Sequence, residues 1–213
     1  MSELVTEHIR NIALAGHAGA GKTTLFEALL HAGGAIQSIG TVERGNTVSD
    51  TDAQEQSRAH SIDSSIAQVQ HDDCRINLID TAGYADFRGG TLSALAAVES
   101  VAIVVNAING IEHGTRRMMM HAHERGLARM LVVNKIDLVP EEERDARVNA
   151  LVRSLRWKGP VFRISGLAHQ GLDGLCQAIM SRLEELNPPT EVETADASQA
   201  DVGSDDEDES AES

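Results

Sequence analysis

A glycine-rich octapeptide near the N-terminus is the stretch that most strongly indicates the fold of the chain. It reads Gly16-His17-Ala18-Gly19-Ala20-Gly21-Lys22-Thr23, with two glycines five positions apart followed by lysine and threonine. An apolar run of strand length, 9–15, comes before it, and a segment with helical spacing, 22–31, comes after it. Glycines allow successive backbone N–H groups to turn inward at the start of a helix, which makes a concave anion site. Strand, loop and helix in this order predict a phosphate-binding loop.

Each polar residue of this loop suits one part of a nucleoside triphosphate. The Lys22 ammonium can reach the β- and γ-phosphates, and the Thr23 hydroxyl can ligate Mg²⁺. We therefore expect nucleotide contacts from the loop and the residue after it, namely Gly16, His17, Ala18, Gly19, Ala20, Gly21, Lys22, Thr23 and Thr24. The alternative, a glycine-rich turn with an incidental Lys-Thr pair, is disfavoured by the flanking strand and helix.

Apolar runs of strand length alternate with longer segments of helical spacing along the rest of the chain. This alternation predicts an α/β fold with a doubly wound, mostly parallel six-stranded sheet, as in a nucleotide-binding domain with a phosphate loop. The expected strands are 9–15, 65–70, 75–79, 101–107, 130–133 and 161–164, and the expected helices are 22–31, 91–100, 112–126, 141–155 and 172–186. We expect residues 32–61 to form a long functional loop, because such loops are uncommon in compact domains.

The charge of the chain is concentrated at its C-terminal end. The chain has 213 residues, with 33 acidic and 18 basic ones, and ten of the acids lie between Glu191 and Glu212, where there is no lysine or arginine. The remainder carries 23 acids against 18 bases, a net charge of −5. We therefore expect a folded domain over 7–186 and a disordered acidic tail over 187–213, whose few large apolar side chains cannot offset the entropy of ordering.

Composition also excludes several classes of protein. The negative balance argues against a nonspecific nucleic-acid binder, which needs a basic face. No stretch approaches the roughly 20 consecutive apolar residues of a membrane span. Two cysteines, Cys74 and Cys176, are too few for a disulfide framework, and in a reducing compartment we expect both to be core or near-core thiols. We expect a cytoplasmic monomer with no membrane contact.

A second polar element follows the apolar run 76–79. It is Asp80-Thr81-Ala82-Gly83, which places Asp80 at the carboxyl end of a strand, where open α/β sheets bind ligands. The Asp80 carboxylate can hold Mg²⁺ through water, and the backbone N–H of Gly83 can meet the γ-phosphate. An isolated Asp-x-x-Gly is a common turn, but its spacing from the phosphate loop favours the functional interpretation.

Two further elements at strand ends concern the nucleotide base. In Asn134-Lys135-Ile136-Asp137, the Asp137 carboxylate can accept from both N1–H and the 2-amino group of guanine, a donor pair that adenine lacks. Asn134 can tie the loops together, and the Lys135 stem can pack along the base. Ser165-Gly166-Leu167 can place a backbone N–H at the guanine 6-oxo group. The four elements together predict a site for GTP and GDP.

With these motifs the chain resembles the translation-factor class of GTPases, specifically elongation factor G and its paralogues. The resemblance covers about 9–137 and is carried by 16–29, 45–50 and 80–87. Ser61 stands where that family has a threonine that binds Mg²⁺ and senses the γ-phosphate, and Tyr84 stands where it has a histidine that orients the attacking water. With the phosphate loop, the resemblance implies catalytic roles for Lys22, Ser61, Gly83 and Tyr84, and Mg²⁺ ligation by Thr23, Ser61 and Asp80.

The C-terminal part, about 138–213, resembles a different group. Residues 155–165 are similar to the end of the GTPase domain in the Obg family, which is linked to ribosome assembly. The acidic tail also resembles that family. These resemblances imply a ribosome or ribosomal RNA as partner. The expected function is binding of Mg²⁺·GTP and its slow hydrolysis to GDP, as a nucleotide-dependent switch. Two alternatives remain: a GTP-sensing module with negligible turnover, and a phosphotransferase, which the Asn134–Asp137 element disfavours.

Overall fold

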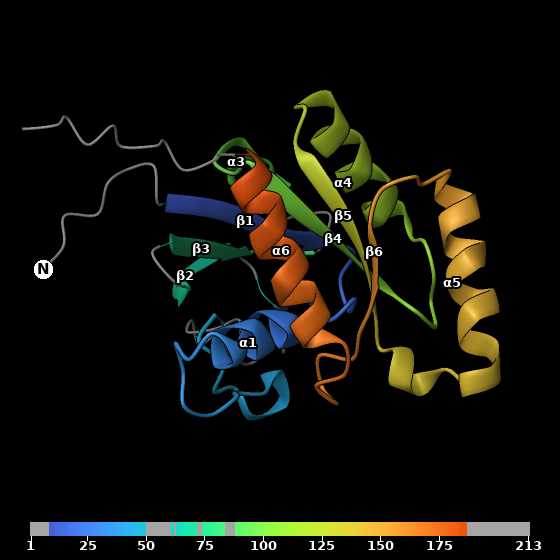
Figure 1. Cartoon of the computed structure of the whole chain (residues 1–213), viewed down its shortest axis with the longest axis horizontal. Coiled ribbons are helices and arrows are strands. Elements are labelled where there is room, and N and C mark those ends of the chain that lie inside the picture. Colours follow the sequence, from blue (N-terminus) through green and yellow to red (C-terminus); the bar gives the residue numbers. More distant parts are fainter. Residues whose placement is uncertain (1–8, 50–60, 62, 72–73, 84–87, 187–213) are drawn as a thin grey trace, which may run out of the picture.

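A computed structural model describes residues 9–49, 61, 63–71, 74–83 and 88–186. Their strands form one six-stranded sheet in the order β2-β3-β1-β4-β5-β6 (Figure 1). The antiparallel partner of β3 is β2, and every other pairing is parallel. The strands are β1 (Ile9–Gly16), β2 (Ser65–His71), β3 (Cys74–Asp80), β4 (Ser100–Asn106), β5 (Ala128–Asn134) and β6 (Val161–Arg163). The expected α/β fold with a mostly parallel sheet is confirmed.

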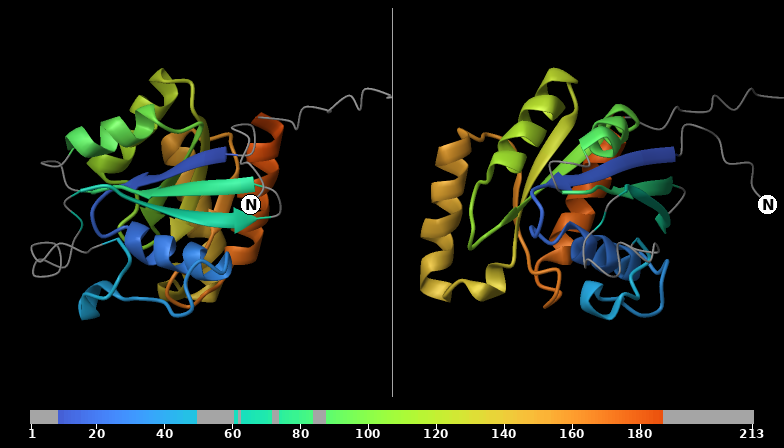
Figure 2. Two further views of the ribbon diagram at one scale, coloured as in Figure 1. Left: turned by 90° about the vertical axis from the view of Figure 1, so that its left-hand side faces the viewer. Right: turned by 180° about the vertical axis from the view of Figure 1, so that it is seen from behind.

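Helices cover both faces of this sheet (Figure 2). Helices α1 (Lys22–Ala32) and α6 (Leu172–Leu186) pack into one apolar cluster, and α3 (Arg88–Ala96), α4 (His113–Glu124) and α5 (Glu141–Leu155) pack into the other. Among the described residues, two short 3-10 helices, η2 (Val42–Arg44) and η4 (Ile136–Leu138), lie in connections. The doubly wound arrangement brings the carboxyl ends of the parallel strands to one edge, where the phosphate loop and the other predicted elements lie.

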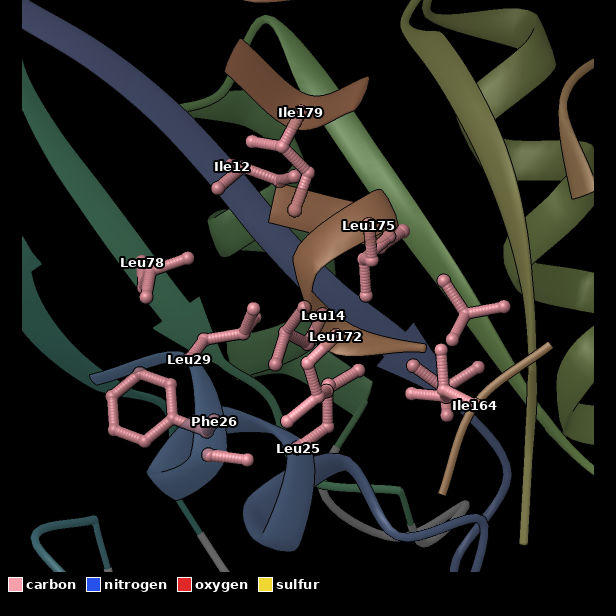
Figure 3. Packing of buried hydrophobic residues seen from close by; sticks show 14 of the residues in the cluster. Ile12, Leu14, Leu25, Phe26, Leu29, Leu78, Ile164, Leu172, Leu175 and Ile179 are labelled. Carbon is pink, nitrogen blue, oxygen red and sulfur yellow. The ribbon is translucent and has the colours of Figure 1, made fainter. Parts of the chain in front are cut away.

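Side chains along β1 point alternately into the two apolar clusters. Ile12 and Leu14 face α1 and α6, where Figure 3 shows them beside Leu175 and Ile179, and the intervening alanines face the other side. Because parallel strands are buried on both faces, their sequences read as continuous apolar runs. Strand β4 is the clearest case, since all of its residues are buried. The two cysteines are free and half-buried, at the edge of the core.

The prediction of a helix over 91–100 is wrong at both ends. Helix α3 spans Arg88–Ala96, and the carbonyl of Glu99 already accepts from the N–H of Ala128 at 3.1 Å. Ser100 is the first residue of β4 and is fully buried. Pairing with the neighbouring strands therefore overrides the helical composition of 97–100, because the sheet satisfies backbone groups that a longer helix would withdraw from it.

Some predictions fall outside the described residues. These include the disorder of the acidic tail over 187–213 and the position of Tyr84. The division into 7–186 and 187–213 stays a prediction. Within the described ranges, no helix combines the length and the apolar character that a membrane span requires.

Candidate nucleotide-binding site

The phosphate loop joins β1 to α1 and adopts the backbone that its glycines predict. Gly19 and Gly21 have φ angles of 76° and 87°, which L-residues with a Cβ rarely adopt. The Lys22 ammonium donates to the carbonyl of His17 at 3.1 Å and to that of Gly16 at 3.4 Å, so it lies across the loop. Burial lowers the pKa of Lys22, and the Asp80 carboxylate partly offsets that effect. The loop thus holds a desolvated cation at the start of a helix.

The three predicted Mg²⁺ ligands come together beside this cation. The Thr23 hydroxyl donates to the Asp80 carboxylate at 2.7 Å and lies 3.1 Å from the Ser61 hydroxyl. They come from the first turn of α1, the end of β3 and the loop before β2. All three offer oxygen, which is the ligand that Mg²⁺ prefers. The donor set therefore fits a magnesium ion.

Gly83 lies directly against the phosphate loop. A Cβ atom at this position would come within 2.6 Å of the Ala18 nitrogen and 2.5 Å of the Lys22 ammonium. The segment is held there by Thr81, whose hydroxyl donates to the Leu14 carbonyl at 2.7 Å. Because a side chain would push the two loops apart, glycine is required here for close approach. Its N–H thus lies close to the loop that the sequence predicts to hold the phosphates.

Asn134 connects three of the four predicted elements. Its amide nitrogen donates to the carbonyls of Ala20 and Gly21 at 3.1 and 3.2 Å. Its amide oxygen accepts from the N–H groups of Lys135 at 2.8 Å and Gly166 at 3.0 Å. Asn134 is buried, so these bonds are shielded from water. The predicted tying role of Asn134 agrees with these contacts.

A pocket of about 370 Å³ opens next to Asn134. One Asp137 carboxylate oxygen is buried, with no hydrogen-bond partner among the residues that the structure describes. A buried acceptor of this kind is costly unless a donor meets it, which suits a ligand with N–H groups. The predicted residues lining the pocket are Gly21, Thr24, Asn134, Lys135, Asp137, Ser165, Gly166 and Leu167, and it is also lined by Ile39, Gly40, Thr41, Glu43, Leu138 and His169.

The loop at Ser165 is organised from within the protein. The Ser165 hydroxyl accepts from the N–H of Ala168 at 2.9 Å, and the N–H of Gly166 is engaged by Asn134. The Leu167 side chain, in contrast, is 73% exposed. Asn134 therefore shapes this part of the pocket together with the Ser165–Leu167 backbone.

His17 contributes to the loop through its backbone, while its ring faces helix α4. The ring nitrogen Nε2 lies 3.3 Å from the Glu112 carboxylate at the start of that helix. A Cβ on Gly114 would come within 2.8 Å of the other ring nitrogen, so the contact is tight. The histidine thus joins the phosphate loop to α4, a contact that sequence reasoning missed.

Glu27 is a second residue that sequence reasoning missed. It lies on α1 and is fully buried, and its carboxylate accepts from the N–H of Gly40 at 2.8 Å and from that of Val48 at 2.5 Å. It therefore anchors the segment that leads from the pocket towards Ser61. The available signal was a carboxylate inside the apolar run Leu25–Leu30, because a buried charge requires partners.

The fold and the four converging elements define a class, that of phosphate-loop GTPase domains. Residues 7–185 match the family model described as the elongation factor Tu GTP binding domain. The chain belongs to this family, a class of GTP-hydrolysing switch domains related to translation. The family match includes the part after 138 that the sequence likened to Obg proteins.

Three relatives illustrate the range of the family. The mitochondrial ribosome-releasing factor 2 of Drosophila willistoni is 37% identical over 183 residues, covering 84% of this chain and 24% of the relative. Peptide chain release factor 3 of Gloeobacter violaceus is 41% identical over 132 residues, 60% of this chain and 25% of the relative. A solved structure from Thermus thermophilus is 37% identical with a TM-score of 0.65, covering 70% of this chain and 22% of that one. The chain spans about a quarter or less of the length of these relatives.

Proposed function

We propose that this protein binds Mg²⁺·GTP, hydrolyses it slowly to GDP, and serves translation as a nucleotide-dependent switch. The observation that carries the proposal is the convergence of the Thr23, Asp80 and Ser61 oxygens within 2.7 to 3.1 Å. They lie next to Lys22 and Gly83, and a Cβ added to Gly83 would come within 2.5 Å of the Lys22 ammonium. Cation, hydroxyls, carboxylate and backbone donor are the groups that position and stabilise a transferring phosphoryl group.

Each group has a separate role in this proposal. Lys22 stabilises the negative charge on the β- and γ-phosphates, and the Gly83 N–H donates to the γ-phosphate. Thr23, Ser61 and Asp80 would hold the magnesium ion, which neutralises phosphate charge. Because Ser61 lies on a long connection and Thr23 on a helix, loss of the γ-phosphate would release the connection first. This difference makes the site a switch.

The proposed rate is low. Tyr84 stands where the family resemblance places a histidine, and a phenol with a pKa of about 10 is neutral at pH 7. It can donate one hydrogen bond but lacks the charge of an imidazolium. We therefore propose turnover close to the unassisted scale of about 10⁻⁴ to 10⁻² s⁻¹. Release of phosphate in a single turnover distinguishes this hydrolase from a module that only senses GTP.

We further propose a cytoplasmic setting, a monomeric state and a ribosomal partner. The names of the relatives, a ribosome-releasing factor and a peptide chain release factor, support the partner. The resemblance of 155–165 to Obg proteins points to ribosomal RNA or an assembling ribosome. Co-sedimentation with ribosomal particles in GTP-analogue and GDP states tests this proposal.

The test of the nucleotide assignment is the variant Asp137→Asn. An amide cannot accept from both guanine donors, so GTP affinity should fall by about 100-fold or more, since a charge-assisted pair is worth on the order of 3 kcal/mol. Xanthosine triphosphate, which presents an acceptor at position 2, should bind the variant better than the wild type. The matched control is Asp173→Asn, an exposed carboxylate outside the pocket. Unchanged GTP affinity in Asp137→Asn would refute the assignment.

A further inference from the structure

A large groove lies at the end of the sheet opposite the nucleotide pocket. Its volume is about 1230 Å³, and its floor is the start of β5 and the segment leading into β6. Its walls come from α4, from the end of α5 and the residues after it (155–160), and from the last turns of α6. These three parts lie at the same end of the molecule in Figure 1. Nothing in the nucleotide chemistry uses this groove.

Positive charge dominates the groove. Five of the chain's 18 basic residues line it: Arg116, Arg129, Arg156, Lys158 and Arg182. The one carboxylate among the described lining residues, Glu185, is paired with Arg182 at 2.7 Å. The folded part has more acids than bases, so this concentration of cations is a local feature of the tertiary structure. Such a groove attracts a negatively charged ligand.

Two aromatic residues line the groove: Phe162 is partly buried against the core, and Trp157 is engaged by its own neighbours. The Arg129 guanidinium lies 5.4 Å from the centre of the Trp157 ring, and the indole N–H donates to the Pro160 carbonyl at 3.1 Å. Gly159 packs so closely that a Cβ would come within 2.5 Å of the ring. Single-stranded nucleic acid binds by stacking bases on free aromatic faces. A ring held in this way favours a ligand recognised by charge alone, such as an acidic peptide.

The chain itself carries such a segment, which follows directly after a helix that lines the groove. The structure describes α6 up to Leu186, and Glu185 in its last turn lines the groove. The first tail acid, Glu191, follows Leu186 by five residues, a span of at most about 17 Å. Ten acids lie between 191 and 212 without a lysine or arginine. A covalently attached segment of this length acts at a millimolar effective concentration, which compensates for weak individual contacts.

We propose that the acidic C-terminal segment 187–213 binds in this groove and shields its five cations from other polyanions. The interaction is electrostatic and does not require the segment to adopt one conformation, since it has few apolar side chains. Because the groove and the nucleotide pocket lie at opposite ends of the sheet, GTP affinity should not depend on it. The inference is independent of the proposed hydrolysis.

The experiment uses Trp157, the chain's single tryptophan, as a reporter within the full-length protein. Quenching by acrylamide, which is uncharged, is compared between the wild type and a full-length variant whose ten tail acids are replaced by their amides. We expect the quenching constant to rise about twofold in the variant at low salt. The difference should disappear at 1 M salt, where the Debye length is about 3 Å.

Two variants locate the effect. The double variant Arg156→Gln/Lys158→Gln removes two exposed cations of the groove and keeps the acidic tail. Its Trp157 quenching constant should rise as it does in the amide variant. In Arg44→Gln/Arg125→Gln, exposed arginines outside the groove, it should stay at the wild-type value. Equal quenching of Trp157 in the wild-type and amide-tail proteins at low salt overturns the proposal. Tight binding of oligouridylate to the wild-type groove also overturns it, because the tail would then not be the occupant.

Discussion

At the scale of single residues, Asn134 shows how a buried amide can organise a binding site. Its four hydrogen bonds use both amide atoms and join the phosphate loop to the loops at 135 and 166. Gly21 allows this contact, since a Cβ there would come within 2.5 Å of the Asn134 amide nitrogen. Base pocket and phosphate loop are therefore held in one fixed arrangement, and the entropy cost of binding is lowered.

The variant Asn134→Ala should lose both stability and nucleotide affinity. It leaves the N–H groups of Lys135 and Gly166 without their acceptor, at a cost of about 2–4 kcal/mol in the free energy of unfolding. The melting temperature should therefore fall by roughly 10 °C. The matched control is Asn109→Ala, since Asn109 is exposed. A melting temperature of Asn134→Ala equal to that of the control would contradict the proposed role.

A second prediction at this scale concerns Tyr84, which lies outside the described residues. If position 84 aligns the attacking water, Tyr84→His should raise the single-turnover rate of GTP hydrolysis, because imidazole adds a group that can carry charge near the γ-phosphate. Tyr84→Phe should lower the rate only if the hydroxyl takes part. Fast wild-type turnover that neither substitution changes would place the water-aligning group elsewhere.

At the scale of elements, helix α1 has two functions on two faces. Its apolar side chains Leu25 and Leu29 pack into the core, and its first turn supplies Lys22 and Thr23 to the site. Between them, Glu27 projects to the segment 40–48 and fixes it through two backbone N–H groups. One helix thus positions the phosphate loop and the start of the connection that leads to Ser61.

Glu27→Ala should loosen that connection. It leaves the N–H groups of Gly40 and Val48 without their acceptor, which should lower the free energy of unfolding by about 2–3 kcal/mol. Hydrogen exchange of residues 40–48 should become faster, while α6 keeps its protection. The control Glu142→Ala removes an exposed carboxylate and should change stability by no more than about 0.5–1 kcal/mol. Unchanged exchange at 40–48 would show that the connection is held by other contacts.

At the scale of the whole molecule, the ligand site joins four segments that lie far apart in the sequence. Phosphate loop, 80–83, Asn134 and 165–167 approach only when the parallel strands are in register, as Leu14 with Asp80 and Asn106 with Asn134 are. A ligand that touches all four elements binds only the folded chain. Binding free energy is then added to the free energy of unfolding.

Mg²⁺·GTP should therefore stabilise the protein strongly. At a ligand concentration of 100 times Kd the gain is about 2.7 kcal/mol, or roughly 5–10 °C in the melting temperature. Chelation of the metal with EDTA should remove most of this shift, because Thr23, Asp80 and Ser61 lose the ion that they would share with the phosphates. The same titration with ATP should leave the melting temperature close to that of the free protein. An equal shift with ATP would rule out recognition of guanine by Asp137.

The sequence by itself determined the class of the fold and the principal elements of the site. Glycine positions, Lys22-Thr23 and the polar residues after apolar runs act through local backbone stereochemistry and hydrophobic periodicity, which a linear chain displays directly. For this reason most strands and helices lie where they were expected, and 141–155 coincides with α5.

Only the tertiary structure decided which distant groups meet. The end of α3 at Ala96, the burial of Glu27, the contact of His17 with Glu112 and the basic groove from Arg116 to Arg182 all depend on strand register and helix packing. The residues that meet in this way lie far apart in the sequence; His17 and Glu112, for example, are 95 positions apart. The free energy of such contacts arises from desolvation and pairing in the folded state, and no local pattern specifies it.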